Sequence, residues 1–218
     1  MEHVVLLGDS IFDNAPYVPA GAEVSAQLQE LLGSQSQVSL LARDGSVLAD
    51  MVEQVARLGA LSVAPTQLVV SCGGNDVLGL VGAMHAPVRT VLEATELLAS
   101  WQADFRRDYR QMLHLVISQG LPVALVTIYD AVPGLAPGLL TALAAFNDVI
   151  LREAVTHHVP VLDLRLVCDE ATDYASSSPI EPSAKGGRKI AATIAEIVLA
   201  QRTPTSRTVV FGETTRKP

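Results

Sequence analysis

The chain alternates short apolar runs with longer segments whose apolar positions recur at helical spacing. The short runs are rich in Val, Leu and Ile, which is typical of strands buried on both faces of a parallel sheet. The predicted strands lie near residues 3–7, 37–41, 67–72, 122–128 and 159–164. The predicted helices cover about 20–32, 47–58, part of 88–119, 139–156 and 184–201.

This alternation predicts one α/β domain over residues 1–202, a three-layer flavodoxin-like fold around a five-stranded parallel sheet. Right-handed crossovers favour the strand order 2-1-3-4-5. In that order the first and third strands are neighbours, so the loops that follow them meet at one edge of the sheet. The polar tail, residues 203–218, contains the apolar residues Val209-Val210-Phe211 and is expected to be either a frayed end or an added strand.

Composition restricts the functions that are compatible with this domain. Of the 218 residues 49% are hydrophobic and 17% are charged, which is typical of a globular protein. The net charge of −8 argues against a nucleic-acid partner. The two cysteines form no disulfide or metal-site pattern. No apolar run is long enough to span a bilayer, so we expect no stable membrane insertion and a cytoplasmic location. The oligomeric state is left open.

The first candidate for chemistry is the sequence Gly8-Asp9-Ser10, directly after the apolar run of the first strand. A serine there lies at the carboxyl end of the sheet, where open α/β folds build their sites. Ser10 is therefore a candidate nucleophile, which requires a base to take its proton and donors to hold an oxyanion. Taken alone, the tripeptide also suits a plain turn in which the serine is a local cap.

The second candidate is Gly73-Gly74-Asn75-Asp76, directly after the third strand. The Asn75 amide is neutral and donates hydrogen bonds without acting as a base, which suits an oxyanion donor. The alternative is a turn in which Asn75 and Asp76 cap the next helix.

Together the two motifs resemble blocks I and III of the SGNH (GDSL-type) serine hydrolases. The resemblance implies acyl transfer from a small-molecule carboxylic ester or thioester, with Ser10 as nucleophile and no metal or organic cofactor. It also implies an oxyanion hole formed by the Ser10 N–H, the Asn75 side chain and a backbone N–H after the second strand. There the sequence Ala42-Arg43-Asp44-Gly45-Ser46 matches loosely, and Gly45 is preferred to Asp44 as the donor.

The block that normally supplies the base departs from the family pattern Asp-x-x-His. This chain has Ser178 in place of the Asp and Glu181 in place of the His, followed by the matching Pro182-Ser183 and Gly186-Gly187. Three alternatives follow. Glu181, our preferred base, would need burial to raise its pKa from about 4.3 toward the imidazole value of about 6.5. In the second alternative the base is His85, the histidine expected on the same side of the sheet as Ser10. In the third, the protein is a non-catalytic ligand-binding protein on the same scaffold.

Further residues are expected to line the site. They are Asp9, Asp44, Gly74, Tyr129 and Ser178. The segment 77–88 contains Gly79 and Gly82 among small apolar residues, which predicts a mobile apolar rim suited to a short acyl chain.

Overall fold

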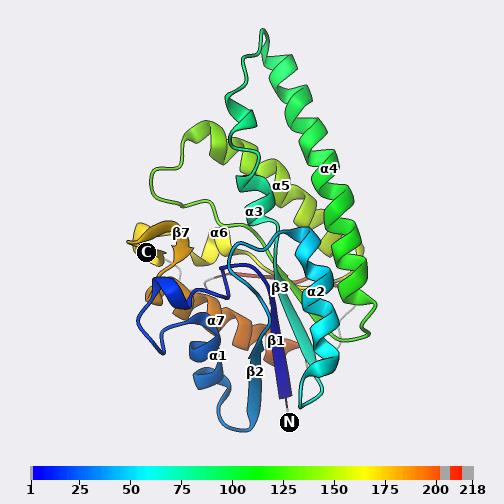
Figure 1. Cartoon of the computed structure of the whole chain (residues 1–218), viewed down its shortest axis with the longest axis vertical. Coiled ribbons are helices and arrows are strands. Elements are labelled where there is room, and N and C mark those ends of the chain that lie inside the picture. The colour runs from blue at the N-terminus through cyan, green and yellow to red at the C-terminus, as the bar shows by residue number, and fades with distance from the viewer. Residues whose placement is uncertain (1, 202–206, 213–218) are drawn as a thin grey trace.

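The central sheet is parallel throughout. The computed structural model describes residues 2–201 and 207–212, and within these ranges six strands form this sheet (Figure 1). They are β1 (Glu2–Gly8), β2 (Ser36–Leu40), β3 (Gln67–Ser71), β4 (Val123–Val126), β5 (Val161–Leu162) and β8 (Val210–Phe211), in the order β2-β1-β3-β4-β5-β8. The predicted order is confirmed, and β8 makes the sheet one strand larger than expected. This strand comes from the tail and pairs with β5.

Helices connect the strands and cover both faces of the sheet (Figure 1). The α-helices are α1 (Val24–Leu32), α2 (Met51–Ala56), α3 (Gly74–Leu78), α4 (Val91–Ile117), α5 (Pro137–Thr156), α6 (Leu164–Val167) and α7 (Ala184–Ala200). Short 3-10 helices are η1 (Ala15–Tyr17), η2 (Leu48–Asp50), η3 (Arg57–Ala60), η4 (Ala83–His85) and η5 (Ala171–Asp173). None of the helices in the described ranges is both long enough and apolar enough to cross a membrane.

Two hydrophobic cores lie on opposite faces of the sheet. Alternate side chains of β1 point to opposite faces, so Val5 and Leu7 join one core while Val4 and Leu6 join the other. The first core contains residues of α2, α4 and α5. The second contains residues of α1, α6 and α7. Burial on both faces explains why the strands are apolar along their whole length.

A small antiparallel hairpin follows η5 and was not expected from the sequence. It consists of β6 (Tyr174–Ala175) and β7 (Ser178–Pro182). Two distant side chains hold it against the domain: the Tyr129 hydroxyl donates to the Ile180 carbonyl, and Asn14 Nδ2 donates to the Pro182 carbonyl at 3.3 Å. The hairpin thereby brings Glu181 to the carboxyl end of the sheet.

Candidate active site

The turn that presents Ser10 requires a glycine before it. Gly8 has φ = +125°, and a Cβ at this position would lie 1.6 Å from the Ser71 carbonyl oxygen. The buried Gln54 side chain fixes the backbone on both sides of Gly8, since it accepts from Gly8 N at 2.7 Å and donates to Gly8 O at 2.8 Å. β1 therefore ends in a close approach to β3, and Ser10 follows at a defined place.

Backbone hydrogen bonds of this turn leave the Ser10 N–H available. The Asp9 carbonyl accepts from Phe12 N and Asp13 N, both at 3.1 Å, which forms one tight turn. The Ile11 N–H donates to the Asp9 side chain at 3.2 Å. Within the described part of the chain the Ser10 N–H has no acceptor. It can therefore donate to a substrate oxygen.

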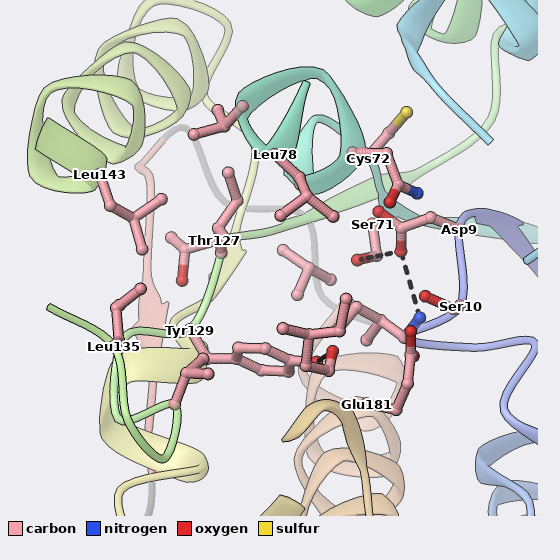
Figure 2. A pocket seen from close by; sticks show the side chains of 18 of the residues that line it. Asp9, Ser10, Ser71, Cys72, Leu78, Thr127, Tyr129, Leu135, Leu143 and Glu181 are labelled. Carbon is pink, nitrogen blue, oxygen red and sulfur yellow. Dashed lines mark hydrogen bonds between the residues drawn. The ribbon is translucent and has the colours of Figure 1, made fainter. Parts of the chain in front are cut away.

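The Asp9 carboxyl is buried beside Ser10. It accepts from the Ser71 hydroxyl at 3.3 Å (Figure 2). Burial raises the pKa of Asp9 from 3.8 to about 7, and the negative charge of Glu181 adds to this rise. Near neutral pH a substantial fraction of Asp9 is therefore protonated.

Asn75 lies in the first turn of α3, on a loop that also needs glycine. Gly73 has φ = +113°, and a Cβ there would be 2.8 Å from the Phe105 ring. Asn75 Nδ2 donates to the Ser46 carbonyl at 2.9 Å. The neighbouring Asp76 carboxylate accepts from Leu48 N at 3.1 Å. These bonds join the loops after β2 and β3, and they occupy one of the two Asn75 amide protons.

Glu181 faces Ser10 from the hairpin, across the end of the sheet (Figure 2). Its side chain is only 4% exposed. Burial raises the pKa of Glu181 from 4.5 to about 7, whereas hydrogen bonding with the Ser10 side chain acts in the opposite direction. Its Oε2 atom is buried without a hydrogen-bond partner among the described residues. The carboxylate thus has a free acceptor atom and a pKa near that of imidazole.

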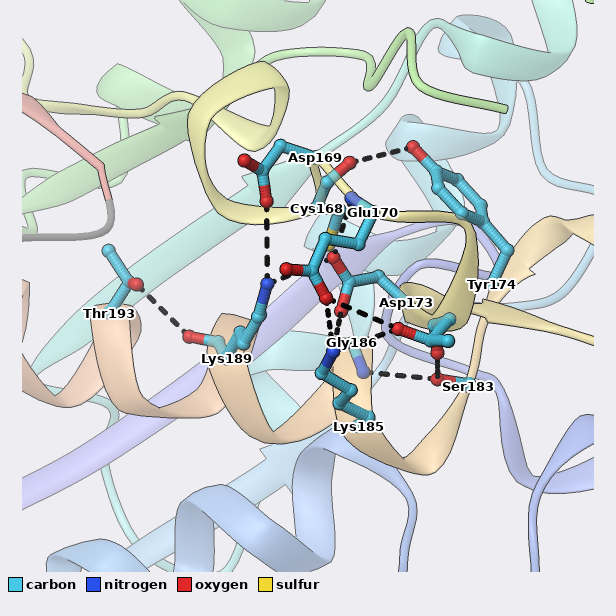
Figure 3. A network of polar contacts seen from close by, with 11 residues as sticks. Cys168, Asp169, Glu170, Asp173, Tyr174, Ser183, Lys185, Gly186, Lys189 and Thr193 are labelled. Carbon is cyan, nitrogen blue, oxygen red and sulfur yellow. Dashed lines mark hydrogen bonds and ion pairs between the residues drawn. The ribbon is translucent and has the colours of Figure 1, made fainter. Parts of the chain in front are cut away.

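An ion-pair network around the buried Asp173 joins η5, which precedes the hairpin, to the start of α7, which follows it (Figure 3). The fully buried Asp173 carboxylate pairs with Lys189 Nζ at 2.9 Å and with Lys185 Nζ at 3.8 Å. The Asp173 carbonyl accepts from Ser183 N at 2.8 Å. A Cβ at Gly186 would lie 2.1 Å from this carbonyl, so the start of α7 can approach η5 only with glycine there. The network fixes both ends of the segment that carries Glu181.

One cavity opens beside Ser10 and contains most of the predicted site residues. Its polar end is formed by Asp9, Ser10, Ser71 and Glu181, and its far end is apolar (Figure 2). Its lining consists of Asp9, Ser10, Ile11, Ser71, Cys72, Gly74, Asn75, Val77, Leu78, Val81, Met84, Val126, Thr127, Ile128, Tyr129, Val132, Leu135, Leu139, Leu143, Ile180 and Glu181. The strand order brings Ser10, Asn75 and Glu181 together from distant segments, with Asp9, Gly74 and Tyr129 beside them.

Four of the candidate residues lie outside this lining. Gly45 is in an exposed turn with φ = +78°. The exposed Asp44 carboxylate accepts from the Tyr17 hydroxyl at 2.6 Å. Ser178 starts β7 at the far end of the strand from Pro182, and His85 is exposed at the end of η4.

The apolar wall contributed by α5 was missed by the sequence reasoning. Leu139 and Leu143 line the cavity. Their spacing of four residues is that of any amphipathic helix, so the pattern alone gives no sign that they face a cavity rather than the core. No group of three or more His, Cys, Asp or Glu side chains in the described ranges is arranged to hold a metal ion.

Comparison with known proteins identifies the family. The sequence profile of the GDSL-like lipase/acylhydrolase family matches residues 6–189. The chain belongs to this family. The match extends from β1 to α7 and therefore includes the loops of Ser10, Asn75 and Glu181. Membership of the GDSL-like lipase/acylhydrolase family supports hydrolysis of ester bonds.

Solved structures share the fold of this GDSL-like protein at low sequence identity. A lipolytic protein of the G-D-S-L family from Veillonella parvula superposes with a TM-score of 0.68 and 17% identity, covering 90% of this chain and 98% of its own. The acetyl xylan esterase AlAXEase superposes with a TM-score of 0.64 at 16% sequence identity, and the match covers 90% of this chain and 99% of the esterase. Phospholipase A1 from Streptomyces albidoflavus superposes with a TM-score of 0.63 at 14% identity, and the match covers 93% of this chain and 99% of the phospholipase. None of the curated proteins matches the sequence.

Proposed function

We propose that the protein is a serine hydrolase of carboxylic esters or thioesters, with Ser10 as nucleophile and Glu181 as general base. One observation carries this proposal: a buried carboxylate with an unpartnered oxygen and a pKa of about 7 faces the serine of the Gly-Asp-Ser turn. A general base works best when its pKa lies near the operating pH. Glu181 therefore meets the requirement that histidine usually meets in this family.

The reaction proceeds in two halves. In the first, Ser10 Oγ attacks the carbonyl carbon while Glu181 takes the hydroxyl proton. The tetrahedral intermediate collapses, the bond to the leaving oxygen or sulfur breaks, and Glu181 returns its proton to the leaving group. In the second, Glu181 takes a proton from water as the water oxygen attacks the acyl-enzyme. The acid is released, and the proton returns to Ser10 Oγ.

Two donors are available for the oxyanion. The Ser10 N–H has no acceptor among the described residues, and the Asn75 amide retains a second N–H beside the one given to Ser46. Donors held in place before the reaction stabilise the developing charge without reorganisation. Gly45, which does not line the cavity, is not needed for this arrangement.

Covalent labelling tests the proposal. Folded wild-type protein is treated with a fluorophosphonate and its intact mass is measured, beside Ser10→Ala, Glu181→Gln and Ser100→Ala, the last an exposed serine of α4 as the matched control. Wild type and Ser100→Ala are expected to gain one adduct. Ser10→Ala is expected to gain none, and Glu181→Gln to react much more slowly. An unlabelled wild type would indicate an unactivated serine and would favour the non-catalytic ligand-binding alternative.

A further inference from the structure

The cavity continues from Ser10 into a region that the proposed chemistry does not use. We call this region the apolar arm and define it by Val81, Met84, Leu135, Leu139 and Leu143. Leu135 and Leu143 lie at the opposite end of the cavity from Ser10 and Glu181 (Figure 2). Three separate segments supply its walls: the η4 region, the loop after β4, and α5. A site for a small acetyl group would require no such region.

The arm has a definite length along α5. Leu139 and Leu143 are one helical turn apart, which corresponds to about 6 Å along the helix axis. Leu143 is buried, and Leu139 and Leu135 are half-buried. The side chains around this end are aliphatic, so each methylene of a ligand placed there would leave water for apolar surroundings.

Charge restricts what enters the polar end. Of the described residues that line the cavity, only Asp9 and Glu181 are acidic, and none is Lys, Arg or His. A phosphate or carboxylate near the reacting carbonyl would face the carboxyl groups of Asp9 and Glu181, which are partly ionised near neutral pH, and the described residues of the lining supply no cation to offset them. The cavity therefore selects against anionic groups close to the scissile bond.

We propose, resting on the serine-hydrolase function above, that the apolar arm holds the alkyl chain of an uncharged medium-chain acyl ester, with Leu135 and Leu143 setting the chain length. The carbonyl lies between Ser10 and Asn75, and the chain runs along α5. The acyl chain of such an ester is longer than the short acyl chain that the sequence of segment 77–88 predicts.

A chain-length series tests this assignment. We compare kcat/KM for the p-nitrophenyl esters of acetate, butyrate, octanoate and palmitate. Wild type is expected to gain up to about fourfold for each methylene that the arm buries. Octanoate is therefore expected to exceed acetate by at least about tenfold. Palmitate is expected to fall below octanoate, because its chain exceeds the arm.

Variants at the end of the arm identify the residues that set the limit. Leu143→Trp shortens the arm and is expected to lower octanoate turnover by about tenfold or more while acetate changes by less than about twofold. Leu140→Trp makes the same change on the same helix at a side chain that is 40% exposed and outside the lining, and is expected to match wild type. Leu135→Trp, placed in a loop, repeats the test should the α5 variant fail to fold.

The outcomes separate this proposal from the proposed function. Equal rates for acetate and octanoate in wild type, or an equal loss for all esters in both Trp variants at the arm, would overturn the acyl assignment and leave the hydrolase intact. No hydrolysis of any ester would overturn the hydrolase. The arm is then tested by calorimetric binding of octanamide and acetamide to wild type and Leu135→Trp. Tighter binding of octanamide, lost in the variant, supports the arm, and equal binding refutes it.

Discussion

Replacing Glu181 by Gln removes the carboxylate that we propose as base and keeps the size of its side chain. A positioned general base contributes about 10²–10⁴ to the rate. Since each tenfold change corresponds to about 1.4 kcal/mol, the variant is expected to lose about 3–5 kcal/mol of transition-state stabilisation. Its kcat/KM for p-nitrophenyl butyrate is expected to fall accordingly, while the fold, followed by circular dichroism, is retained.

The pH dependence distinguishes a buried base from an ordinary carboxylate. Because burial raises the pKa of Glu181 to about 7, activity is expected to rise with pH and level off above that value. At pH 5 only about 1% of Glu181 would be in the basic form, whereas a carboxyl with the ordinary pKa of 4.5 would be about three-quarters ionised. The initial rate at pH 5 relative to pH 8 therefore measures the effect of burial directly.

Asp9 provides the matched control, since its carboxyl lines the same cavity and its pKa is also about 7. Asp9→Asn is expected to keep the rise of activity with pH near pH 7, and Glu181→Gln is expected to lose this rise. Rates are followed at the isosbestic wavelength of p-nitrophenol, with folding verified at each pH. If Glu181→Gln keeps the rise of activity near pH 7, or keeps the wild-type rate, the assignment of Glu181 as base is refuted and His85 becomes the next candidate.

Two further predictions concern neighbouring groups. Asn75→Ala removes an oxyanion donor and is expected to lower kcat about 10²–10³-fold with little change in KM; steady-state kinetics showing the reverse would contradict this role. Asp9→Asn is expected to change the pH dependence of stability. The raised pKa of Asp9 means that its contribution to folding is present below pH 3.8 and is lost as pH rises through 7. Urea unfolding is expected to give Asp9→Asn a free energy of unfolding that exceeds that of wild type by about 4 kcal/mol at pH 8. This difference is expected to vanish at low pH. A constant difference between the two proteins would contradict the proposed pKa.

Several features of the protein follow from local sequence patterns. The apolar runs around Val4–Leu7 and Leu68–Ser71 predicted buried parallel strands, because a strand that is covered on both faces is apolar along its whole length. The strand order and the approach of Ser10 to Asn75 then followed, because parallel strands direct their carboxyl ends to one edge. The Gly-Asp-Ser turn was recognisable from its place directly after the first apolar run, and the structure gives the reason for its glycine, since the backbone at Gly8 tolerates no Cβ.

Other features depend on contacts between distant segments, and these were decided by the tertiary structure. The hairpin that carries Glu181 contains two prolines and few apolar residues, and it is held by Tyr129, Asn14 and the ion pairs of Asp173. The pKa of Glu181 depends on this burial, which is a property of the surroundings and not of the residue type. The apolar arm likewise arises where α5 passes the end of the sheet. A local pattern specifies which side chains are apolar, but only the packed chain determines whether they meet a neighbour or leave a cavity for a ligand.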